Sequence, residues 1–437
     1  MTYFQDLFSN LYVLGLFSLL GALFLSLKIY PAIINIVHIK NLMDDPSKGH
    51  SIHKNKTPTL GGVGLFIAFA LLLILFGLFM QLEQEHLSKI LGLVAATMIL
   101  MFLGAKDDLV DLAPKKKFIA QLISASIVIF LTDARITNFY GLLGIHELSY
   151  IASIVFTLFV FLLVVNSYNL IDGIDGLAGS IAIICSLSFG IYFLLNKSHI
   201  MVLISFVLIG AIIGFLRYNL SHEKKMFMGD SGSLFIGFLL TYQGIIFLTE
   251  NSLETTQYYI SNAPIMLLVV LSFPLLDTLR VFIIRAKKGL SPFTADRNHI
   301  HHRLLDLGFK HGRASLLISI INILIMTLSF LVRDYNINIQ LLICVGMGSL
   351  LYLSPFLISY KKETLFKEED VLMVTNKTKI TQEIPFVPVQ REYNIATDLP
   401  NHEEVREEVE NKRMKKIFAK RLAELKKMAS KQKRQQF

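Results

Sequence analysis

The stretch that decides the fold is Gly61 to Met80, which reads GGVGLFIAFALLLILFGLFM. It carries no charged side chain, and its length matches the roughly 20 apolar residues that a helix needs to cross a bilayer. The whole chain of 437 residues has the same character, with 53% hydrophobic and 17% charged residues. A typical soluble domain has about 25% charged residues. We therefore predict an integral membrane protein.

Ten further apolar runs resemble Gly61–Met80. Together they predict an all-α polytopic membrane protein with about eleven transmembrane helices, near residues 10–28, 61–80, 87–104, 118–132, 151–166, 177–195, 200–216, 232–249, 264–284, 314–332 and 338–358. The run at 118–132 is the shortest of these. The N-terminus does not resemble a cleaved signal peptide, so the first run is expected to remain as an anchor. Cys185 and Cys344 fall inside apolar runs and are read as small buried hydrophobic residues.

Lys and Arg gather in alternate loops. By our boundaries the loops at 28–60, 105–117, 217–231 and 285–313 hold roughly 19 of them, against about three in the opposite set. The positive-inside rule places the basic set in the cytoplasm, which predicts an N-terminus outside and a cytoplasmic C-terminus. The formal charge of +9 is then mostly a topology signal, and no nucleic-acid partner is needed to explain it.

The composition changes after Tyr360. Residues 1–360 are expected to form the transmembrane domain, and 361–437 to form a polar cytoplasmic tail with a basic C-terminal segment. This basic segment could contact anionic lipid headgroups, but a solvated helix or a loose tail explains it equally well. We assign the tail no chemistry.

The first polar motif, GAKDDLVD at 104–111, ends the third apolar run and brings Asp107, Asp108 and Asp111 together. Three crowded carboxylates repel one another unless a cation offsets their charge, and the lysines at 115–117 add positive charge nearby. A simple polar cap is the alternative. A cap needs only one Asp, however, and ionisable residues at a membrane boundary are functional candidates.

The second motif, NSYNLIDGIDG at 166–176, follows directly on an apolar run. Asn166, Asn169 and Asp172 recur every three residues and so follow one helical face, and Asp175 continues the spacing. Amide and carboxylate oxygens suit a hard cation such as Mg²⁺ or Mn²⁺. A chance polar patch at a span end would rarely be so regular.

The third motif, FMGDSGS at 227–233, precedes the eighth apolar run. Its glycines and serines can turn backbone N–H groups and hydroxyls toward a phosphate, with Asp230 on a phosphate-bound metal. Alone the segment would be weak, because short Gly/Ser turns cap many helices. It gains force because the charge rule places it on the same side as the first two motifs.

The fourth motif, DRNHIHHR at 296–303, lies in the longest of the basic loops. Its histidines and arginines can donate hydrogen bonds to a diphosphate or to sugar oxygens. Zinc is the tempting alternative, but no nearby Cys or suitably spaced carboxylate completes such a site. A basic loop without chemistry is the other alternative. The segment HSIHKNKTPTLGG at 50–62 adds Lys56 and hydroxyls near the second run as supporting evidence.

With these four motifs in this order, residues 10 to 358 resemble the polyprenyl-phosphate N-acetylhexosamine-1-phosphate transferase family. Within it the chain is most similar to bacterial UDP-N-acetylglucosamine:undecaprenyl-phosphate transferases, because HIHH at 299–302 resembles the GlcNAc-1-phosphate branch. The resemblance implies a multi-pass enzyme of the bacterial plasma (inner) membrane. It would transfer GlcNAc 1-phosphate from UDP-GlcNAc to undecaprenyl phosphate at its cytoplasmic face, releasing UMP and initiating cell-envelope polysaccharide synthesis. The sugar epimer, the prenyl length and a homodimer stay open.

The resemblance also implies roles for individual residues. Asp107 and Asp108 would lie beside the lipid phosphate, one acting as a base or, in an alternative mechanism, as a covalent nucleophile. Asn169 and Asp230 would hold Mg²⁺, with Mn²⁺ as a substitute, on the UDP pyrophosphate. Phe227 would stack on uracil, and Asp175 would hydrogen-bond to it. The remaining expected substrate contacts are Lys56, Lys117, Asn166, Asp172, His299, His301, His302 and Arg303.

Two other classes compete with this interpretation. A transporter would also have many spans, but transporters place ionisable groups near the bilayer midplane, whereas here they line one edge. A membrane prenyltransferase also uses Asp clusters with Mg²⁺, but it would need a second Asp-rich motif in place of the His-rich loop. A UMP-release assay separates the three classes.

Overall fold

The computed structural model describes residues 7–40, 43–44, 57–80, 82–110, 112–253, 255–290 and 298–358. The chain divides into two units, 1–360 and 361–437. All described residues belong to the first unit, so the predicted tail lies outside the described residues. Lys56, Asp111 and Asp296 also lie outside them.

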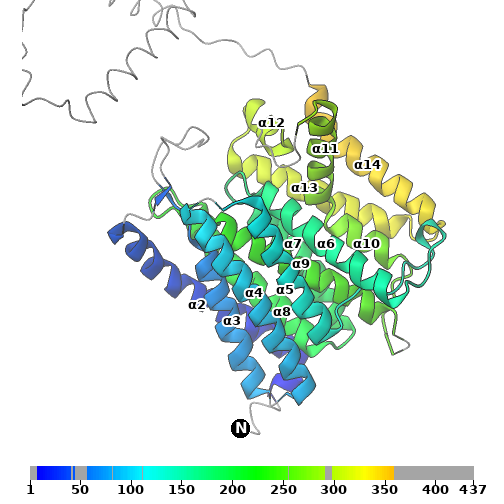
Figure 1. The fold of residues 1–437 in the computed structure, drawn as a ribbon, viewed down its shortest axis with the longest axis horizontal. Coiled ribbons are helices and arrows are strands. Elements are labelled where there is room, and N and C mark those ends of the chain that lie inside the picture. Colours follow the sequence, from blue (N-terminus) through cyan, green and yellow to red (C-terminus); the bar gives the residue numbers. More distant parts are fainter. Residues whose placement is uncertain are drawn as a thin grey trace, which may run out of the picture. The chain divides into compact units, whose positions relative to one another are not determined.

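The described part of the chain is built almost entirely of helices (Figure 1). The helices are α2 (Leu11–Ile39), α3 (Gly61–Phe79), α4 (Gln84–Val110), α5 (Pro114–Thr132), the 3₁₀ helix η1 (Leu142–Gly144), α6 (Tyr150–Ile171), α7 (Leu177–Leu195), α8 (His199–Asn219), α9 (Gly229–Asn251), α10 (Ala263–Val270), α11 (Ser272–Lys287), α12 (Ile300–Asp306), α13 (His311–Leu331) and α14 (Ile337–Leu357). Two short strands, β1 (Met43–Asp44) and β2 (Thr57–Pro58), pair antiparallel. The predicted all-α polytopic class is confirmed.

Ten of the eleven predicted apolar runs each lie in one helix of the structure to within one residue, and the run at 264–284 falls on two helices. Among the described residues, nine helices are long and apolar enough to cross a membrane, and the bent pair α10 and α11 makes a tenth if it counts as one span. The helix α5 contains the short run at 118–132, and three lysines in its first turn shorten its apolar part further. The count of eleven crossings and the sides of the two termini stay predictions.

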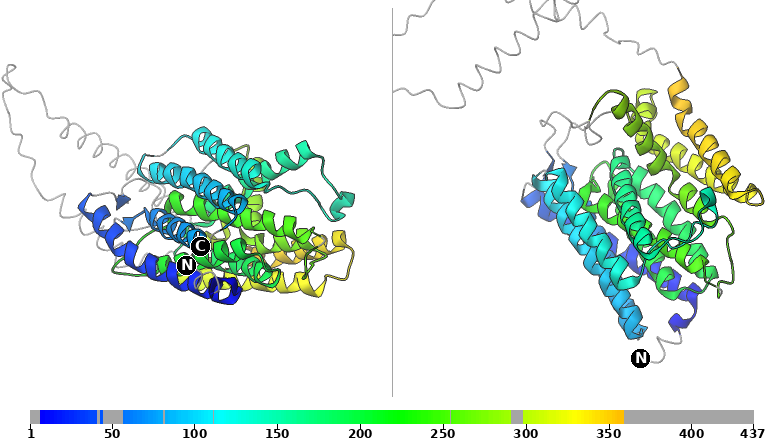
Figure 2. Two further views of the ribbon diagram at one scale, coloured as in Figure 1. Left: turned by 90° about the horizontal axis from the view of Figure 1, so that it is seen from below. Right: turned by 45° about the vertical axis from the view of Figure 1, so that its right-hand side comes forward.

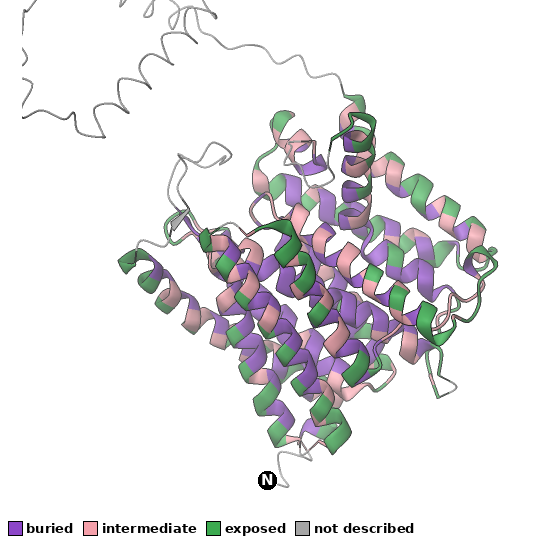
Figure 3. Ribbon diagram, viewed as in Figure 1, coloured by how far each residue is buried: buried purple, intermediate pink, exposed green. Residues whose placement is uncertain are grey.

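The bundle has buried and exposed positions along each helix (Figure 3), and α2 has large apolar side chains at exposed positions and hydroxyl groups at buried ones. Tyr12 and Phe24 are 71% and 64% exposed, whereas Ser18 and Ser26 are fully buried. The Ser26 hydroxyl donates to the carbonyl of Ala211 on α8 at 3.0 Å, so this polar group is satisfied between helices. A soluble protein rarely exposes so much hydrocarbon, and lipid tails would cover it.

The helix α9 is the axis of the bundle. Every residue from Ser231 to Ile245 is buried, as expected for a helix that neighbours surround on all sides. The helices α3, α4, α6, α7 and α10 all pack against it, and Figure 2 shows the long helices side by side. The amino end of α9 begins with Gly229 and Asp230, so the axis ends in the third polar motif.

The single span predicted at 264–284 is two helices, because α10 and α11 meet at a bend of 71°. Pro274 has no N–H group and cannot continue the hydrogen-bond ladder of α10 to the carbonyl of Val270. The side chain of Asn322 on α13 donates instead to the carbonyls of Val269 and Val270, at 3.2 and 3.3 Å. The missing N–H group of Pro274 therefore causes the bend, and the side chain of Asn322 stabilises it.

Gly104→Ala is expected to destabilise the protein, because a Cβ atom at this position of α4 would overlap the backbone of Ser231 on α9. Overpacking of this kind costs on the order of 1–3 kcal/mol. Gly346→Ala on α14 is the matched control, since nothing lies within 4 Å of a Cβ atom there. The apparent Tm in detergent should fall only for Gly104→Ala. Equal Tm values for both variants would contradict the close packing of α4 on α9.

Candidate active site

Three of the four polar motifs meet at one end of the bundle. The carboxyl ends of α4 and α6 lie beside the amino ends of α5 and α9. Two of the contacts between these helix ends are made to the carboxylate of Asp230. Lys117 Nζ lies 2.8 Å from its Oδ2, and Asn169 Nδ2 donates to its Oδ1 at 2.9 Å. These side chains come from three helices, α5, α6 and α9, that are far apart in the sequence.

Asp108 of α4 caps the amino end of α9. Its Oδ1 accepts the backbone N–H of Asp230 at 2.7 Å, and its Oδ2 accepts the backbone N–H and the hydroxyl of Ser231 at 3.2 and 2.8 Å. The first N–H groups of a helix have no partner within that helix, and its dipole attracts negative charge. Gly229 has a φ of +71°, and a Cβ atom there would lie 2.6 Å from Asp108 Oδ2. The cap therefore requires glycine at position 229.

Asp107 and Asp230 share one ammonium group. Lys117 Nζ forms ion pairs with both carboxylates, and Asp107 Oδ1 also accepts the backbone N–H of Leu112 at 2.6 Å. Asn169 completes the cluster through Asp230 and also donates to the hydroxyl of Ser233 at 2.7 Å. With Asp108 close by, the cluster has three carboxylates and one ammonium. Its surplus of negative charge favours a second cation.

The chemistry of this donor set fits Mg²⁺. Across the described ranges no three His, Cys, Asp or Glu side chains are grouped to hold a metal by themselves. Mg²⁺ commonly takes one or two carboxylates and completes its shell with water and substrate phosphates. Asp230 and the amide oxygen of Asn169 would supply such a partial shell. The metal itself stays a prediction.

The turn after α6 carries a second acidic group. Asp175 Oδ2 lies 2.6 Å from Lys225 Nζ and 2.9 Å from His311 Nδ1. Burial alone would raise the pKa of Asp175, but hydrogen bonds from His311 and Lys225 outweigh burial and hold that pKa below its usual value. The Lys225 ammonium also lies 5.4 Å from the centre of the Phe227 ring. A nucleobase that stacks on Phe227 must therefore use the other face of the ring or displace Lys225.

Asn166 and Asp172 have different surroundings. The amide of Asn166 exchanges two hydrogen bonds with that of Gln121, at 2.7 and 3.3 Å, which ties α6 to α5 one turn beyond Lys117. Within the described part of the chain the Asp172 carboxylate has no hydrogen-bond partner. Burial and the charges of Asp230 and Asp108 raise the pKa of Asp172 well above its usual value. Asp172 is therefore available to a ligand, whereas Asn166 is engaged between helices.

The His-rich segment reaches this turn. The ring of His301 is 1% exposed and lies against Gly173. Neither of its ring nitrogens has a partner among the described residues. Burial lowers the pKa of His301 well below its usual value, and His302 and His299 lower it further. A neutral imidazole with two unsatisfied nitrogens therefore faces the second motif.

Arg303 has partners of its own. Its Nε donates to the carbonyl of Pro355 at 3.2 Å, and its guanidinium donates to that of Ile358 at 2.6 Å. These contacts place the positive charge at the carboxyl end of α14, where the helix dipole favours it. Its predicted contact with sugar or diphosphate stays a prediction, as do those of His299, His302 and Lys56.

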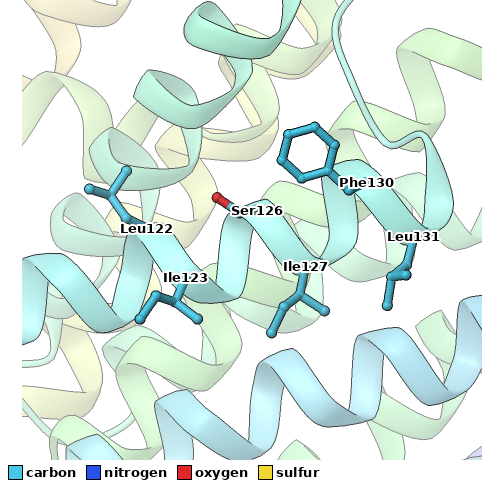
Figure 4. A pocket seen from close by; sticks show the side chains of 6 residues that line it. All are labelled: Leu122, Ile123, Ser126, Ile127, Phe130 and Leu131. Atoms are coloured by element: carbon cyan, nitrogen blue, oxygen red, sulfur yellow. The ribbon is translucent and has the colours of Figure 1, made fainter.

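An apolar hollow on the outward face of α5 is separate from this cluster (Figure 4). It is lined by Leu122, Ile123, Ser126, Ile127, Phe130 and Leu131. Its single polar side chain cannot hold a nucleotide or a sugar. The hollow suits hydrocarbon better than a charged group.

Comparison with known proteins places these motifs in a family. Residues 90–248 match the sequence profile described as Glycosyl transferase family 4. The decaprenyl-phosphate N-acetylglucosaminephosphotransferase of Mycolicibacterium smegmatis is 33% identical over 285 residues, which cover 61% of this chain and 70% of that protein. The chain belongs to glycosyl transferase family 4.

Two other similar proteins also have names of polyprenyl-phosphate N-acetylglucosamine-phosphate transferases. The undecaprenyl-phosphate alpha-N-acetylglucosaminyl 1-phosphate transferase of Salmonella typhi is 30% identical, over 68% of this chain and 79% of its own length. The probable undecaprenyl-phosphate N-acetylglucosaminyl 1-phosphate transferase of Bacillus subtilis is 28% identical, over 73% of this chain and 85% of its own length. The resemblance inferred from the motifs is confirmed. The family 4 match at 90–248 takes in the first three motifs, and the His-rich segment follows it.

The structure also brings in residues that the motifs did not indicate. Lys225 and His311 hold Asp175, and Asp277 contacts His299. Lys225 had a weak local signal, since it lies two residues before Phe227. His311 begins α13 and Asp277 lies on α11, and nothing in either local sequence indicates its partner.

Lys117→Met should lower the thermal stability of the protein, because Asp107 and Asp230 would then face each other without a shared cation. Millimolar Mg²⁺ should raise the apparent Tm of this variant more than that of the wild type, since a divalent cation replaces the lost charge. Lys116→Met, at an exposed neighbouring position, is the control and should respond like the wild type. Identical Mg²⁺ responses in all three proteins would contradict a cation site at this cluster.

Proposed function

We propose that this chain transfers N-acetylglucosamine 1-phosphate from UDP-GlcNAc to a polyprenyl phosphate such as undecaprenyl phosphate, at the cytoplasmic face of a bacterial plasma membrane. An oxygen of the lipid phosphate attacks the sugar-bearing phosphorus of UDP-GlcNAc, and the bond from that phosphorus to the bridging oxygen breaks. UMP leaves with that oxygen. The observation that carries the proposal is the cluster of Asp107, Lys117, Asn169 and Asp230 at one end of the helix bundle. The names of the relatives support the same reaction.

The hydrogen bonds divide the work between the two adjacent aspartates. Both oxygens of Asp108 are used by the start of α9, so Asp108 holds that helix in place. Asp107 instead faces Lys117, the group that would pair with an incoming lipid phosphate. Asp107 is therefore the better candidate for the base that keeps this phosphate fully ionised. A phosphate dianion is already a competent nucleophile, so positioning and charge neutralisation are what the reaction needs.

The donor substrate would lie between Asp230 and the His-rich segment. Asp230 and Asn169 would hold Mg²⁺, which when bound supplies positive charge to the departing UMP. Phe227 offers a face to uracil, and Asp175 offers a carboxylate that Lys225 and His311 orient. The unpaired nitrogens of His301 would meet hydroxyl or acetamido groups of the sugar.

Purified protein freed of endogenous lipid should release no UMP from UDP-GlcNAc and Mg²⁺ until polyprenyl phosphate is added. Direct attack needs both substrates bound together, whereas a covalent aspartyl intermediate would let the enzyme cleave UDP-GlcNAc first. Labelled UMP should likewise not exchange into UDP-GlcNAc without the lipid. A stoichiometric burst of UMP in its absence would replace the single displacement by a covalent mechanism. No UMP under any condition would reject the proposed function.

Asp107→Asn and Asp108→Asn should both lose most activity, but only the first should recover as the pH rises. The second ionisation of a phosphate monoester lies near pH 6, at about the value known for phosphorylated side chains, so above about pH 7.5 the lipid phosphate no longer needs the base. The ratio of wild-type to Asp107→Asn activity should therefore shrink between pH 6 and 8.5. Asp108→Asn should lower the apparent Tm and stay inactive at all pH values. The reverse pattern would exchange the two roles.

A further inference from the structure

A buried carboxylate outside the four motifs contacts the His-rich segment. Asp277 of α11 has no exposed surface, and its two oxygens accept hydrogen bonds from that segment. His299 Nδ1 lies 2.8 Å from Oδ2, and the backbone N–H of Ile300 donates to Oδ1 at 2.8 Å. Burying a carboxylate is costly unless hydrogen bonds compensate for the lost water. These two bonds supply that compensation, and both lie in the segment that faces the second motif.

The carboxylate fixes the orientation of the His299 ring. A carboxylate accepts and does not donate, so the ring nitrogen that faces it carries the hydrogen. Only Nε2 of His299 then remains to meet a ligand, and it has no partner in the described part of the chain. The ring also stacks on that of His301, with centroids 5.4 Å apart and planes 15° apart. Holding one ring therefore helps to hold the other against the turn at 172–175.

The broken helix explains how Asp277 reaches this position. The sequence FPLLDTL at 273–279 continues an apolar run. If α10 and α11 formed one straight helix, Asp277 would stay in line with the span. The bend of 71° between α10 and α11 turns α11 toward α12 instead. Pro274 causes the break, and Asn322 satisfies the carbonyls that the break leaves open. The bend, the buried carboxylate and the histidine form one connected arrangement.

We propose that Asp277 is a positioning residue for the transfer reaction and acts through His299. It holds Nδ1 so that Nε2 faces the sugar diphosphate. This inference rests on the proposed function. Asp277 itself touches no substrate. A purely structural role would affect stability and both substrates alike, whereas positioning of His299 affects the UDP-sugar alone.

A double-mutant cycle with kinetics on the purified full chain tests the proposal. Asp277→Asn preserves shape, but its amide N–H₂ group either donates to His299 Nδ1, which reverses the tautomer and moves the ring hydrogen to Nε2, or faces the N–H of Ile300, which loses that bond. We expect kcat/KM for UDP-GlcNAc to fall on the order of tenfold, with KM for polyprenyl phosphate unchanged. In a His299→Ala background, Asp277→Asn should cause less than about a twofold further loss, because residues that act through one another are not additive. An equal tenfold loss in both backgrounds would overturn the proposal.

Two further variants keep the test decisive. Asp306→Asn removes a carboxylate from the last residue of α12, where it has no hydrogen-bond partner among the described residues, and its kinetics should match the wild type. If Asp277→Asn is too unstable to purify, Asp277→Glu restores the carboxylate. It should purify with a selective loss for UDP-GlcNAc that disappears in the His299→Ala background, and persistence of that loss would overturn the proposal. An inactive wild type would reject the proposed function, whereas additive losses in an active enzyme would reject only the role of Asp277.

Discussion

Asp108 of α4 accepts hydrogen bonds from the backbone N–H groups of Asp230 and Ser231 at the start of α9. The α9 helix is buried along most of its length, so its amino end cannot rely on water to satisfy these groups. The cap satisfies them and fixes where the third motif stands relative to the first. Lys117 and Asn169 then meet Asp230 because that residue is the second of the capped helix. The geometry of the polar cluster therefore depends on one carboxylate that does not itself face Lys117.

The His-rich side of the site depends on the break between α10 and α11. The break before Pro274 removes α11 from the line of α10, and Asn322 makes that break tolerable inside the bundle. The turn of α11 presents Asp277 to the His-rich segment, whose His301 then faces Gly173. A capped helix on one side and a broken helix on the other thus enclose the acidic turn at 172–175. Irregular backbone is tolerated at a membrane edge where it lines a polar site.

Much of this was predictable because it is local. An apolar run predicts a span from its own residues, and each carboxylate motif stands out at a span end. Lys117 was predictable only through the family resemblance, because the sequence alone does not distinguish it from Lys115 and Lys116. In the structure, the three lysines lie on different faces of α5, and Lys117 is the one that contacts Asp107 and Asp230. Asp277 was not predictable, because it lies within an apolar run and its partner His299 is 22 residues away across a bend. Contacts that depend on where two helix ends meet need the tertiary structure.

The charge of the site determines how its substrates must arrive. Asp107 and Asp230 share the Lys117 ammonium, and Asp108 lies beside them. Burial and the charges of Asp230 and Asp108 raise the pKa of Asp172. A diphosphate and a lipid phosphate each bring further negative charge into the same space. Neither can approach this cluster favourably as a bare anion, because like charges in a partly buried site repel strongly. On the proposed function, Asp230 and Asn169 would hold the Mg²⁺ that offsets the charge of the UDP-sugar, and the Lys117 ammonium would offset the charge of the lipid phosphate.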